Sequence, residues 1–288
     1  MSSIEQSIKR KIESVGTPLK DWDINIYRGV LTGCNEAFII STEKRDEILA
    51  NCETEEERAR TSELIRPILR GRDIKRYGYE WANLYLIATF PACRYDIDNY
   101  PAVKDYLVSF AEQNLRESGN NWVADLYLED YCKQKLAQTG KFIEIKGKRI
   151  YIGNTAEKAR KKTSNKWFET QDSISYWEDF YKPKLFYADI TQQMNFCLCK
   201  EVMFCNNTTY FIATEDEKVL EHLHTYLNSP IVDWYYRTLS VQLGEKAVRM
   251  FSIYVLDIPV PSMAKGNDFY EILKLTPSEI DFIECREH

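Results

Sequence analysis

A short basic segment, Leu64–Tyr77, constrains the fold more than any other part of the sequence. It contains five basic residues and one acid, and Pro67 and Gly71 interrupt it. Neither residue suits the interior of a helix or strand. Pro67 favours an extended conformation at Arg66, and Gly71 can adopt a positive φ. The pattern predicts a stiff, turned loop with outward guanidinium groups, pinned to a core by Leu64, Ile65, Ile68, Leu69 and Ile74.

Two readings of this segment are open. Guanidinium groups fit phosphate oxygens and the major-groove edge of guanine through paired hydrogen bonds. The same residues could equally form a solvated surface turn in which the arginines pair with nearby acids.

The composition is typical of a packed protein. Hydrophobic residues make up 44% of the 288 residues, enough for one large domain or two small ones. No stretch approaches the roughly 20 apolar residues of a membrane span, and the first residues lack the apolar core of a signal peptide. The eight cysteines form no dense framework, which favours reduced thiols in a cytoplasmic protein.

The net charge of −6 does not exclude a nucleic-acid partner. Basic residues concentrate in Leu64–Arg76 and in Lys141–Lys166, where nine basic residues face only two acids. The rest of the chain is therefore strongly acidic. Since the local field steers binding, a globally acidic chain can still present a basic face.

Periodicity predicts an α+β fold, with antiparallel or mixed β-sheets and flanking helices. Helices are predicted from Ile4 to Val15, over Ser41–Ala50 and Glu53–Ile65, and from Pro101 to Gly119. Strands are predicted at Trp22–Tyr27, Phe38–Ile40 and Leu84–Ala88. The segment between the first two strands is predicted to display Arg28, Thr32 and Asn35, with Thr32 and Asn35 hydrogen-bonding outward.

The clearest hairpin signal is Lys141–Ile152, with Lys146–Gly147 as its turn. This register places Ile143 opposite Ile150, Ile145 opposite Lys148, Glu144 opposite Arg149 and Phe142 opposite Tyr151. A basic run, Lys158–Lys162, follows the hairpin. This run forms either a solvated helix face or a segment that contacts successive phosphates of a nucleic acid.

The last third is rich in strand-forming residues. Strands are predicted at Lys184–Ile190 and Phe196–Cys199, and a hairpin around Asn206–Asn207 joins Val202–Cys205 to Thr209–Ala213. A helix capped by Thr214 and Glu217 is predicted to stop at Asn228-Ser-Pro230, before a second helix, Ile231–Leu239. The packed part is predicted to close at Pro261, and the remainder to form a helical or frayed tail.

Metal and catalytic patterns are weak. Cys197, Cys199, Cys205, His222 and His224 match no structural zinc spacing, so no metal site is predicted. Asp130 with Glu144-Ile-Lys146 matches an Asp…Glu-x-Lys arrangement that binds Mg²⁺ in nucleases. Because that spacing arises often by chance, a metal-dependent nuclease is an alternative and no catalytic residue is assigned.

Two motifs together resemble a known family. Arg28-Gly-Val-Leu-Thr-Gly-Cys-Asn-Glu-Ala-Phe38 and Pro67-Ile-Leu-Arg-Gly-Arg-Asp-Ile74 are similar to the TaqI-like C-terminal specificity domain of adenine-N6 DNA methyltransferases and type IIG restriction–modification enzymes. Weaker echoes occur at Tyr100-Pro through Leu115-Arg116, Tyr181–Leu185, Leu227–Pro230 and Ile258–Pro261.

The resemblance implies a target recognition domain over residues 22–262, preceded by a helix and linker (1–21) and followed by the tail (263–288). Its partners would be double-stranded DNA and upstream methyltransferase and nuclease modules. The catalytic Asn-Pro-Pro-Tyr motif and the glycine-rich S-adenosylmethionine loop are absent from the sequence. The chain would therefore bind DNA without catalysis and hold no cofactor, with S-adenosylmethionine and Mg²⁺ bound in the upstream modules. The further alternative is a protein-interaction scaffold in a phage-defence complex.

The residues predicted to contact DNA come from both basic segments and from the segment before Phe38. They are Arg28, Thr32, Asn35, Arg66, Arg70, Arg72, Lys75, Arg76, Lys146, Lys148, Arg149, Lys161 and Lys162.

Overall fold

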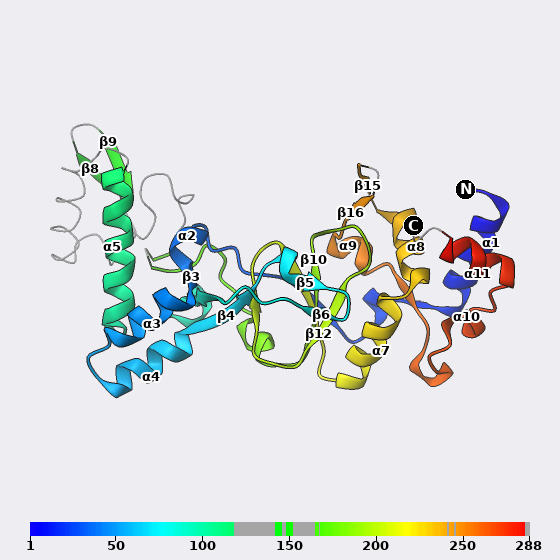
Figure 1. Cartoon of the computed structure of the whole chain (residues 1–288), viewed down its shortest axis with the longest axis horizontal. Helices are drawn as coiled ribbons and strands as arrows, with labels where there is room; N and C mark the ends of the chain where they lie inside the picture. The colour runs from blue at the N-terminus through cyan, green and yellow to red at the C-terminus, as the bar shows by residue number, and fades with distance from the viewer. Residues whose placement is uncertain are drawn as a thin grey trace. The chain divides into compact units, whose positions relative to one another are not determined.

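The chain folds into two compact units in the computed structural model (Figure 1). The structure describes residues 1–117, 142–145, 148–151, 165–166, 168–240, 242–244 and 246–285. The first unit consists of Met1–Gly29, Leu69–Ala82 and Glu178–His288, and the second consists of Val30–Ile68 and Asn83–Trp177. Helices and antiparallel sheets occur together, which confirms the predicted α+β class. No helix within the described residues is long and apolar enough to cross a membrane.

The first unit is built on an antiparallel sheet of order β12-β10-β14-β2. Leu185 pairs with Leu198 on one side and with Ile212 on the other, and Ile212 pairs with Ile26. Because side chains alternate along a strand, these residues share one face with Tyr187 and Phe196, in the main hydrophobic core. The bounds of the strands are β2 Asn25–Arg28, β10 Lys184–Ala188, β12 Phe196–Cys199 and β14 Thr209–Ala213.

Helices from both ends of the chain pack on this core (Figure 1). They are α1 Ser3–Val15, α7 Glu217–Leu227, α8 Pro230–Leu239, α10 Phe269–Ile272 and α11 Pro277–Glu284. Phe269, Leu273 and Ile283 are at most 7% exposed in the same cluster as Ile8 and Ile12. The prediction that the packed part closes at Pro261 is therefore wrong, since the apolar face of the last helices completes the core. The helical character predicted for this segment is correct.

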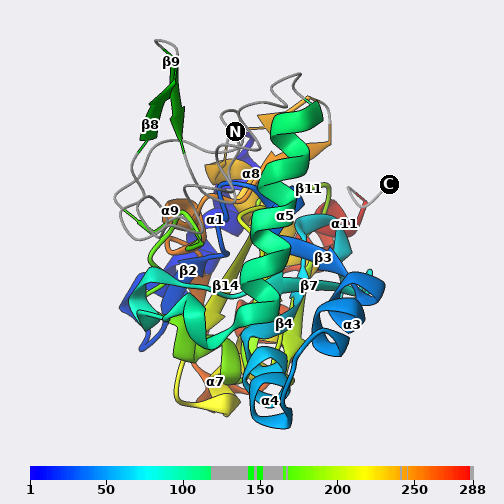
Figure 2. The same ribbon diagram turned by 90° about the vertical axis from the view of Figure 1, so that its left-hand side faces the viewer.

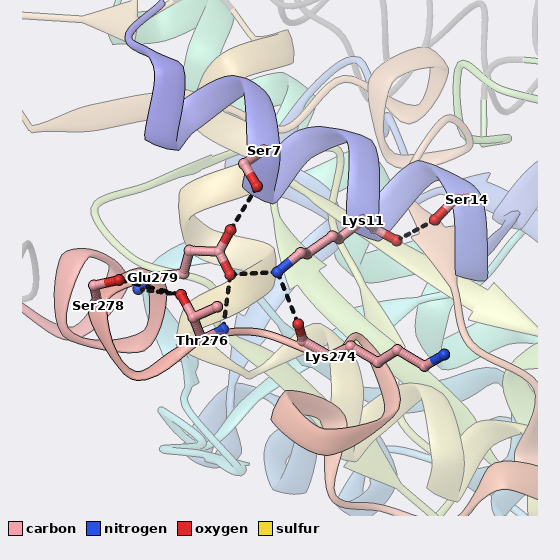
Figure 3. A network of polar contacts seen from close by, with 7 residues as sticks. All are labelled: Ser7, Lys11, Ser14, Lys274, Thr276, Ser278 and Glu279. Atoms are coloured by element: carbon pink, nitrogen blue, oxygen red, sulfur yellow. Dashed lines mark hydrogen bonds and ion pairs between the residues drawn. The ribbon is translucent and has the colours of Figure 1, made fainter.

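A polar network ties α11 to α1 (Figure 3). The Glu279 carboxylate accepts hydrogen bonds from Ser7 Oγ at 2.6 Å, from Lys11 Nζ at 2.7 Å and from the Thr276 backbone N–H at 2.7 Å. Lys11 Nζ also donates to the carbonyl of Lys274 at 2.8 Å. Three donors therefore satisfy a carboxylate that is only 4% exposed.

Smaller elements complete the first unit. Thr17 pairs with Val260 between two short strands near the ends of the chain. The remaining bounds are β1 Thr17–Pro18, η1 Leu19–Asp21, β11 Ile190–Thr191, β13 Phe204–Cys205, β15 Gln242–Leu243, β16 Ala247–Arg249, α9 Ser252–Val255, β17 Pro259–Val260 and η6 Met263–Lys265; η5 spans Trp177–Tyr181.

The second unit contains β7 between β3 and β4, with both pairs antiparallel. Figure 2 shows α3, α4 and α5 around these strands. Glu57, only 4% exposed, accepts a hydrogen bond from the N–H of Ala102 in the first turn of α5. The bounds are α2 Asn35–Phe38, β3 Ile39–Ser41, α3 Thr42–Ala50, α4 Glu55–Leu64, β4 Ile65–Leu69, β7 Leu84–Ile87, η3 Pro91–Cys93, η4 Ile97–Asn99 and α5 Pro101–Glu117.

The hairpin predicted at Lys141–Ile152 is confirmed in its backbone register. Strands β8 (Phe142–Ile145) and β9 (Lys148–Tyr151) pair with Ile143 opposite Ile150 and Glu144 opposite Arg149, as predicted.

Two local predictions in the last third are wrong. Strand β13 does not form a hairpin with β14, because the neighbours of β14 in its sheet are β10 and β2. The N-cap of α7 is Asp216, whose carboxylate accepts from the N–H of Lys218. Thr214 instead accepts from the N–H of Asp216, two residues later in the chain.

Candidate nucleic-acid interface

The basic segment folds as regular structure rather than as the predicted loop. Pro67 lies inside β4, and the chain then forms the 3-10 turn η2 (Gly71–Asp73), β5 (Ile74–Lys75) and β6 (Gly78–Tyr79). Strands β5 and β6 pair and lie against β12 of the first unit. The side chain of Ile74 is 4% exposed. The segment is therefore anchored across a sheet, which restricts where its basic side chains can reach.

Arg70 turns inward, which contradicts the predicted outward guanidinium. Its Nε and Nη2 donate to the Asp73 carboxylate at 3.0 and 2.8 Å, and its backbone N–H donates to the same group at 2.8 Å. Burial alone would raise the pKa of Asp73, but the hydrogen bonds from Arg70 outweigh it and lower that pKa. Arg70 therefore follows the second interpretation of this segment, in which an arginine pairs with a nearby acid. The Asp73 carboxylate is only 5% exposed, so it needs such a partner.

The segment Asn206–Thr208 forms a hydrogen-bonded turn in the first unit. The buried Asn206 side chain accepts hydrogen bonds from the backbone N–H and the hydroxyl of Thr208, at 3.1 and 2.6 Å. The N–H of Asn206 donates to the carbonyl of Leu69 at 2.9 Å. Asparagine side chains stabilise turns in this way by bonding to the backbone two residues on.

Both Arg-Gly motifs of the sequence dock on this turn. A Cβ on Gly29 would lie 2.1 Å from the carbonyl oxygen of Asn206, and one on Gly71 would lie 2.6 Å from that of Thr208. The N–H of Gly71 donates to the Thr208 hydroxyl at 2.9 Å. Only glycine permits so close an approach of two backbones. The motifs are far apart in the sequence, yet both lead to the Asn206–Thr208 turn.

The two segments docked on the turn both carry exposed basic residues. The exposed Arg28 donates from Nε to the carbonyl of Asn207 at 3.1 Å. Arg72 follows Gly71 and is exposed, and its guanidinium makes no hydrogen bond to the described residues. Lys75 donates to the carbonyl of Arg72 at 3.0 Å and lies 3.6 Å from the Glu80 carboxylate.

An acid lies near this turn. Burial raises the pKa of the Asp189 carboxyl, and the nearby Arg249 and Arg28 partly oppose that rise. The N–H of Asp189 donates to the carbonyl of Thr208 at 3.0 Å, so this residue adjoins the turn as well.

Arg76 and Tyr77 form the tip of the β5–β6 hairpin. Arg76 is half-buried and donates to the carbonyl of Asn228 at 2.6 Å, with its guanidinium 5.3 Å from the Tyr77 ring. Tyr77 is 59% exposed with φ at 69°, and its ring is perpendicular to that of His224, with 5.6 Å between the ring centroids. The prediction that the Arg76 guanidinium points outward is therefore only partly correct, because its Nη2 donates an internal hydrogen bond to Asn228.

Three predicted contacts belong to the second unit. Thr32 is fully buried, its hydroxyl donates to Asn35 Oδ1 at 2.7 Å, and the N–H of Cys34 donates to that hydroxyl. The prediction that Thr32 hydrogen-bonds outward is therefore wrong. Asn35 is exposed at the start of α2, and Arg66 is half-buried in β4.

The second basic segment stays a prediction. Lys146, Lys161 and Lys162 lie outside the described residues, and Lys148 and Arg149 are placed only by the backbone pairing of β9. Of the nuclease arrangement, Asp130 and Lys146 also lie outside the described residues.

The cysteine and histidine side chains show a structural environment. Burial raises the pKa of Cys197 to about 12 and that of Cys199 to about 11, so both stay protonated at neutral pH. His222 Nε2 lies 2.7 Å from the carbonyl of Pro261. In the part of the chain that the structure describes, no three His, Cys, Asp or Glu side chains are placed to hold a metal ion.

Comparison with known proteins agrees with the resemblance seen in the sequence. Residues 139–260 match the family model of the TaqI-like C-terminal specificity domain. No curated protein sequence matches the chain. The type IIG restriction endonuclease BpuSI has a similar fold, with a TM-score of 0.56 at 13% identity over 100% of this chain and 28% of the BpuSI chain. This chain therefore spans little more than a quarter of the length of BpuSI.

A second solved structure is the type IIL restriction–modification enzyme MmeI in complex with DNA. It has a TM-score of 0.44 at 11% identity and covers 84% of this chain and 25% of the MmeI chain. The family match includes the Asn206–Thr208 turn, Tyr181–Leu185 and Leu227–Pro230, while both Arg-Gly motifs precede it. Over residues 139–260, this chain is thus similar to the TaqI-like C-terminal specificity domain family.

Proposed function

We propose that the chain recognises a short sequence in duplex DNA, as the specificity domain of a restriction–modification enzyme or an adenine-N6 DNA methyltransferase. The observation that carries the proposal is the docking of both Arg-Gly motifs on the Asn206–Thr208 turn. This turn lies within the residues that match the specificity-domain model. Each of the two segments docked on it carries an exposed arginine.

Arg28, Arg72 and Lys75 are the proposed contacts of the first unit. An exposed lysine or arginine on a phosphate contributes sequence-independent, salt-dependent affinity, whereas an arginine bidentate to guanine contributes specificity. Arg70 has a different role, since its ion pair with Asp73 holds the η2 turn from which Arg72 projects. Asn35, Arg66, Lys148, Arg149 and the remaining predicted lysines are proposed contacts of the second unit.

Catalysis is assigned to other modules in this proposal. The chain covers 28% of the BpuSI chain, and its sequence contains no Asn-Pro-Pro-Tyr motif. S-adenosylmethionine and Mg²⁺ would bind in methyltransferase and nuclease modules of the same polypeptide or complex. The present chain would supply the sequence preference.

The test is the salt dependence of duplex binding by the full chain. Fluorescence anisotropy with a mixed-sequence labelled duplex, between 50 and 200 mM KCl, gives the affinity and its salt slope. For Arg28→Ala and Arg72→Ala, a lost phosphate contact reduces the slope by about one, and a lost guanine contact costs ~1–3 kcal/mol at one base position. Arg10→Ala removes an exposed arginine of α1 and serves as the matched control.

Two results would contradict the proposal. One is the absence of duplex binding at the lowest salt concentration, which would favour the interaction scaffold. The other is unchanged affinity and sequence preference in the Arg28→Ala/Arg72→Ala double variant, with an unchanged circular dichroism spectrum.

A further inference from the structure

We infer that Asn207 is a specificity-determining residue that reads an adenine base in the major groove. The inference rests on the proposed function and adds to it one residue and one base. Sequence reasoning treated Asn207 only as part of a hairpin turn, and the hairpin is absent because β14 pairs with β10 and β2.

The backbone of Asn207 is held on both sides. Its carbonyl accepts from Arg28 Nε at 3.1 Å. The preceding Asn206 bonds through its own backbone to Leu69 and through its side chain to Thr208. The following Thr208 accepts from Gly71 at 2.9 Å. The turn therefore needs little ordering when it binds, which lowers the entropic cost of recognition.

The side chain of Asn207, in contrast, takes no part in holding the fold. Across the described residues its amide makes no hydrogen bond, and its nitrogen and oxygen are not among the buried polar atoms that lack a partner. The amides of Asn206 and Asn228 are instead occupied by internal hydrogen bonds. Asn207 is half-buried, and its side-chain amide keeps a donor and an acceptor accessible at a fixed backbone position.

That pair of groups matches one base edge in particular. An asparagine amide can donate to adenine N7 and accept from adenine N6 at the same time, in the major groove. The exposed guanidinium groups of Arg28 and Arg72, brought to the same turn, can bind the flanking phosphates or guanines. A bidentate contact of this kind discriminates against the wrong base by roughly fivefold to 150-fold.

The experiment is selection of bound duplexes from a randomised library by the full chain, followed by sequencing. The unmodified chain is expected to enrich a motif with a fixed A·T pair at one position. Asn207→Ala should relax that position alone. Asn207→Asp should shift it towards C, because a carboxylate accepts from cytosine N4. Asn25→Ala, an exposed asparagine of β2 in the same unit, should leave the motif unchanged.

A base analogue then tests the contact directly. Replacing the selected adenine by 7-deazaadenine removes the N7 acceptor, so it should weaken binding of the unmodified chain several-fold and leave Asn207→Ala unaffected. An unchanged motif in both Asn207 variants, or equal sensitivity of Asn207→Ala to the analogue, would overturn the inference while the proposed function stands. Absence of any duplex binding by the unmodified chain would overturn both.

Discussion

Replacement of Glu279 by glutamine tests the polar network that joins α11 to α1. Glutamine keeps the size of the side chain but removes its charge and one acceptor. Burial alone would raise the pKa of Glu279, yet the hydrogen bonds from Lys11, Ser7 and Thr276 outweigh it and lower that pKa from 4.5 to about 2. The carboxylate is therefore stabilised by the folded state, and its removal should destabilise the protein.

The size of the effect follows from the pKa shift. One pKa unit corresponds to about 1.36 kcal/mol, so the shift sets a ceiling of about 3 kcal/mol on the contribution of the charge. The Lys11 side chain is 29% exposed, and water weakens its share of the attraction. We therefore expect Glu279→Gln to lower the free energy of unfolding at pH 7 by about 1.5–3 kcal/mol.

The assay is urea unfolding, followed by circular dichroism, at intervals from pH 2 to pH 8. Because the folded pKa is lowered, the contribution of Glu279 is complete above its unfolded pKa of 4.5 and is lost as the pH falls towards about 2. The difference between the two proteins should shrink over that window. Lys20→Met removes the exposed ion pair with Asp257 and should leave the stability nearly unchanged, because solvent screens that pair. A difference that does not depend on pH would refute the reasoning.

Three further changes have expected outcomes from unfolding measurements. Lys184 is fully buried and burial lowers its pKa, so its unfavourable contribution should fade as the pH rises to 10.5; Lys184→Met should therefore raise stability at pH 7 by about 1 kcal/mol and remove this pH dependence. Gly29→Ala should destabilise by about 1–3 kcal/mol through the contact with Asn206, whereas Gly78→Ala, with nothing within 4 Å, should be close to neutral. Asp73→Asn should cost about 1.5–3 kcal/mol at pH 7, an effect lost as the pH falls below 3.8, because the folded pKa of Asp73 is lowered.

The sequence predicted the local structure well where one signal dominates. The α1 stripe of Ile8 and Ile12 and the Lys141–Ile152 hairpin register follow from periodicity and a two-residue turn, both of which are local properties. The loop prediction for Leu64–Tyr77 is wrong because Pro67 and Gly71 do not interrupt regular structure here. In the structure Pro67 is part of β4, and Gly71 serves close packing against Thr208.

The candidate site was predictable in its motifs but not in its assembly. The motifs predict Arg28 and Arg72 as exposed basic residues, whereas the turn on which both segments dock is far from either in the sequence. Arg70 resembles Arg72 in sequence, and only the buried Asp73 carboxylate distinguishes their roles. Asn206 and Thr208 carry a recognisable turn pattern, but nothing local indicates that two glycines pack against them.

The pairing of α1 with α11 has a consequence for the order in which the protein can fold. Ser7 and Glu279 are 272 residues apart in the chain. At synthesis rates of ~5–20 residues per second, the later residue emerges roughly 14 to 54 s after the earlier one. Until then the apolar stripe of Ile8 and Ile12 lacks part of the core that covers it, whereas the segments of the second unit are complete by Trp177. The first unit should therefore close last, and truncation of α11 should leave α1 exposed to proteolysis.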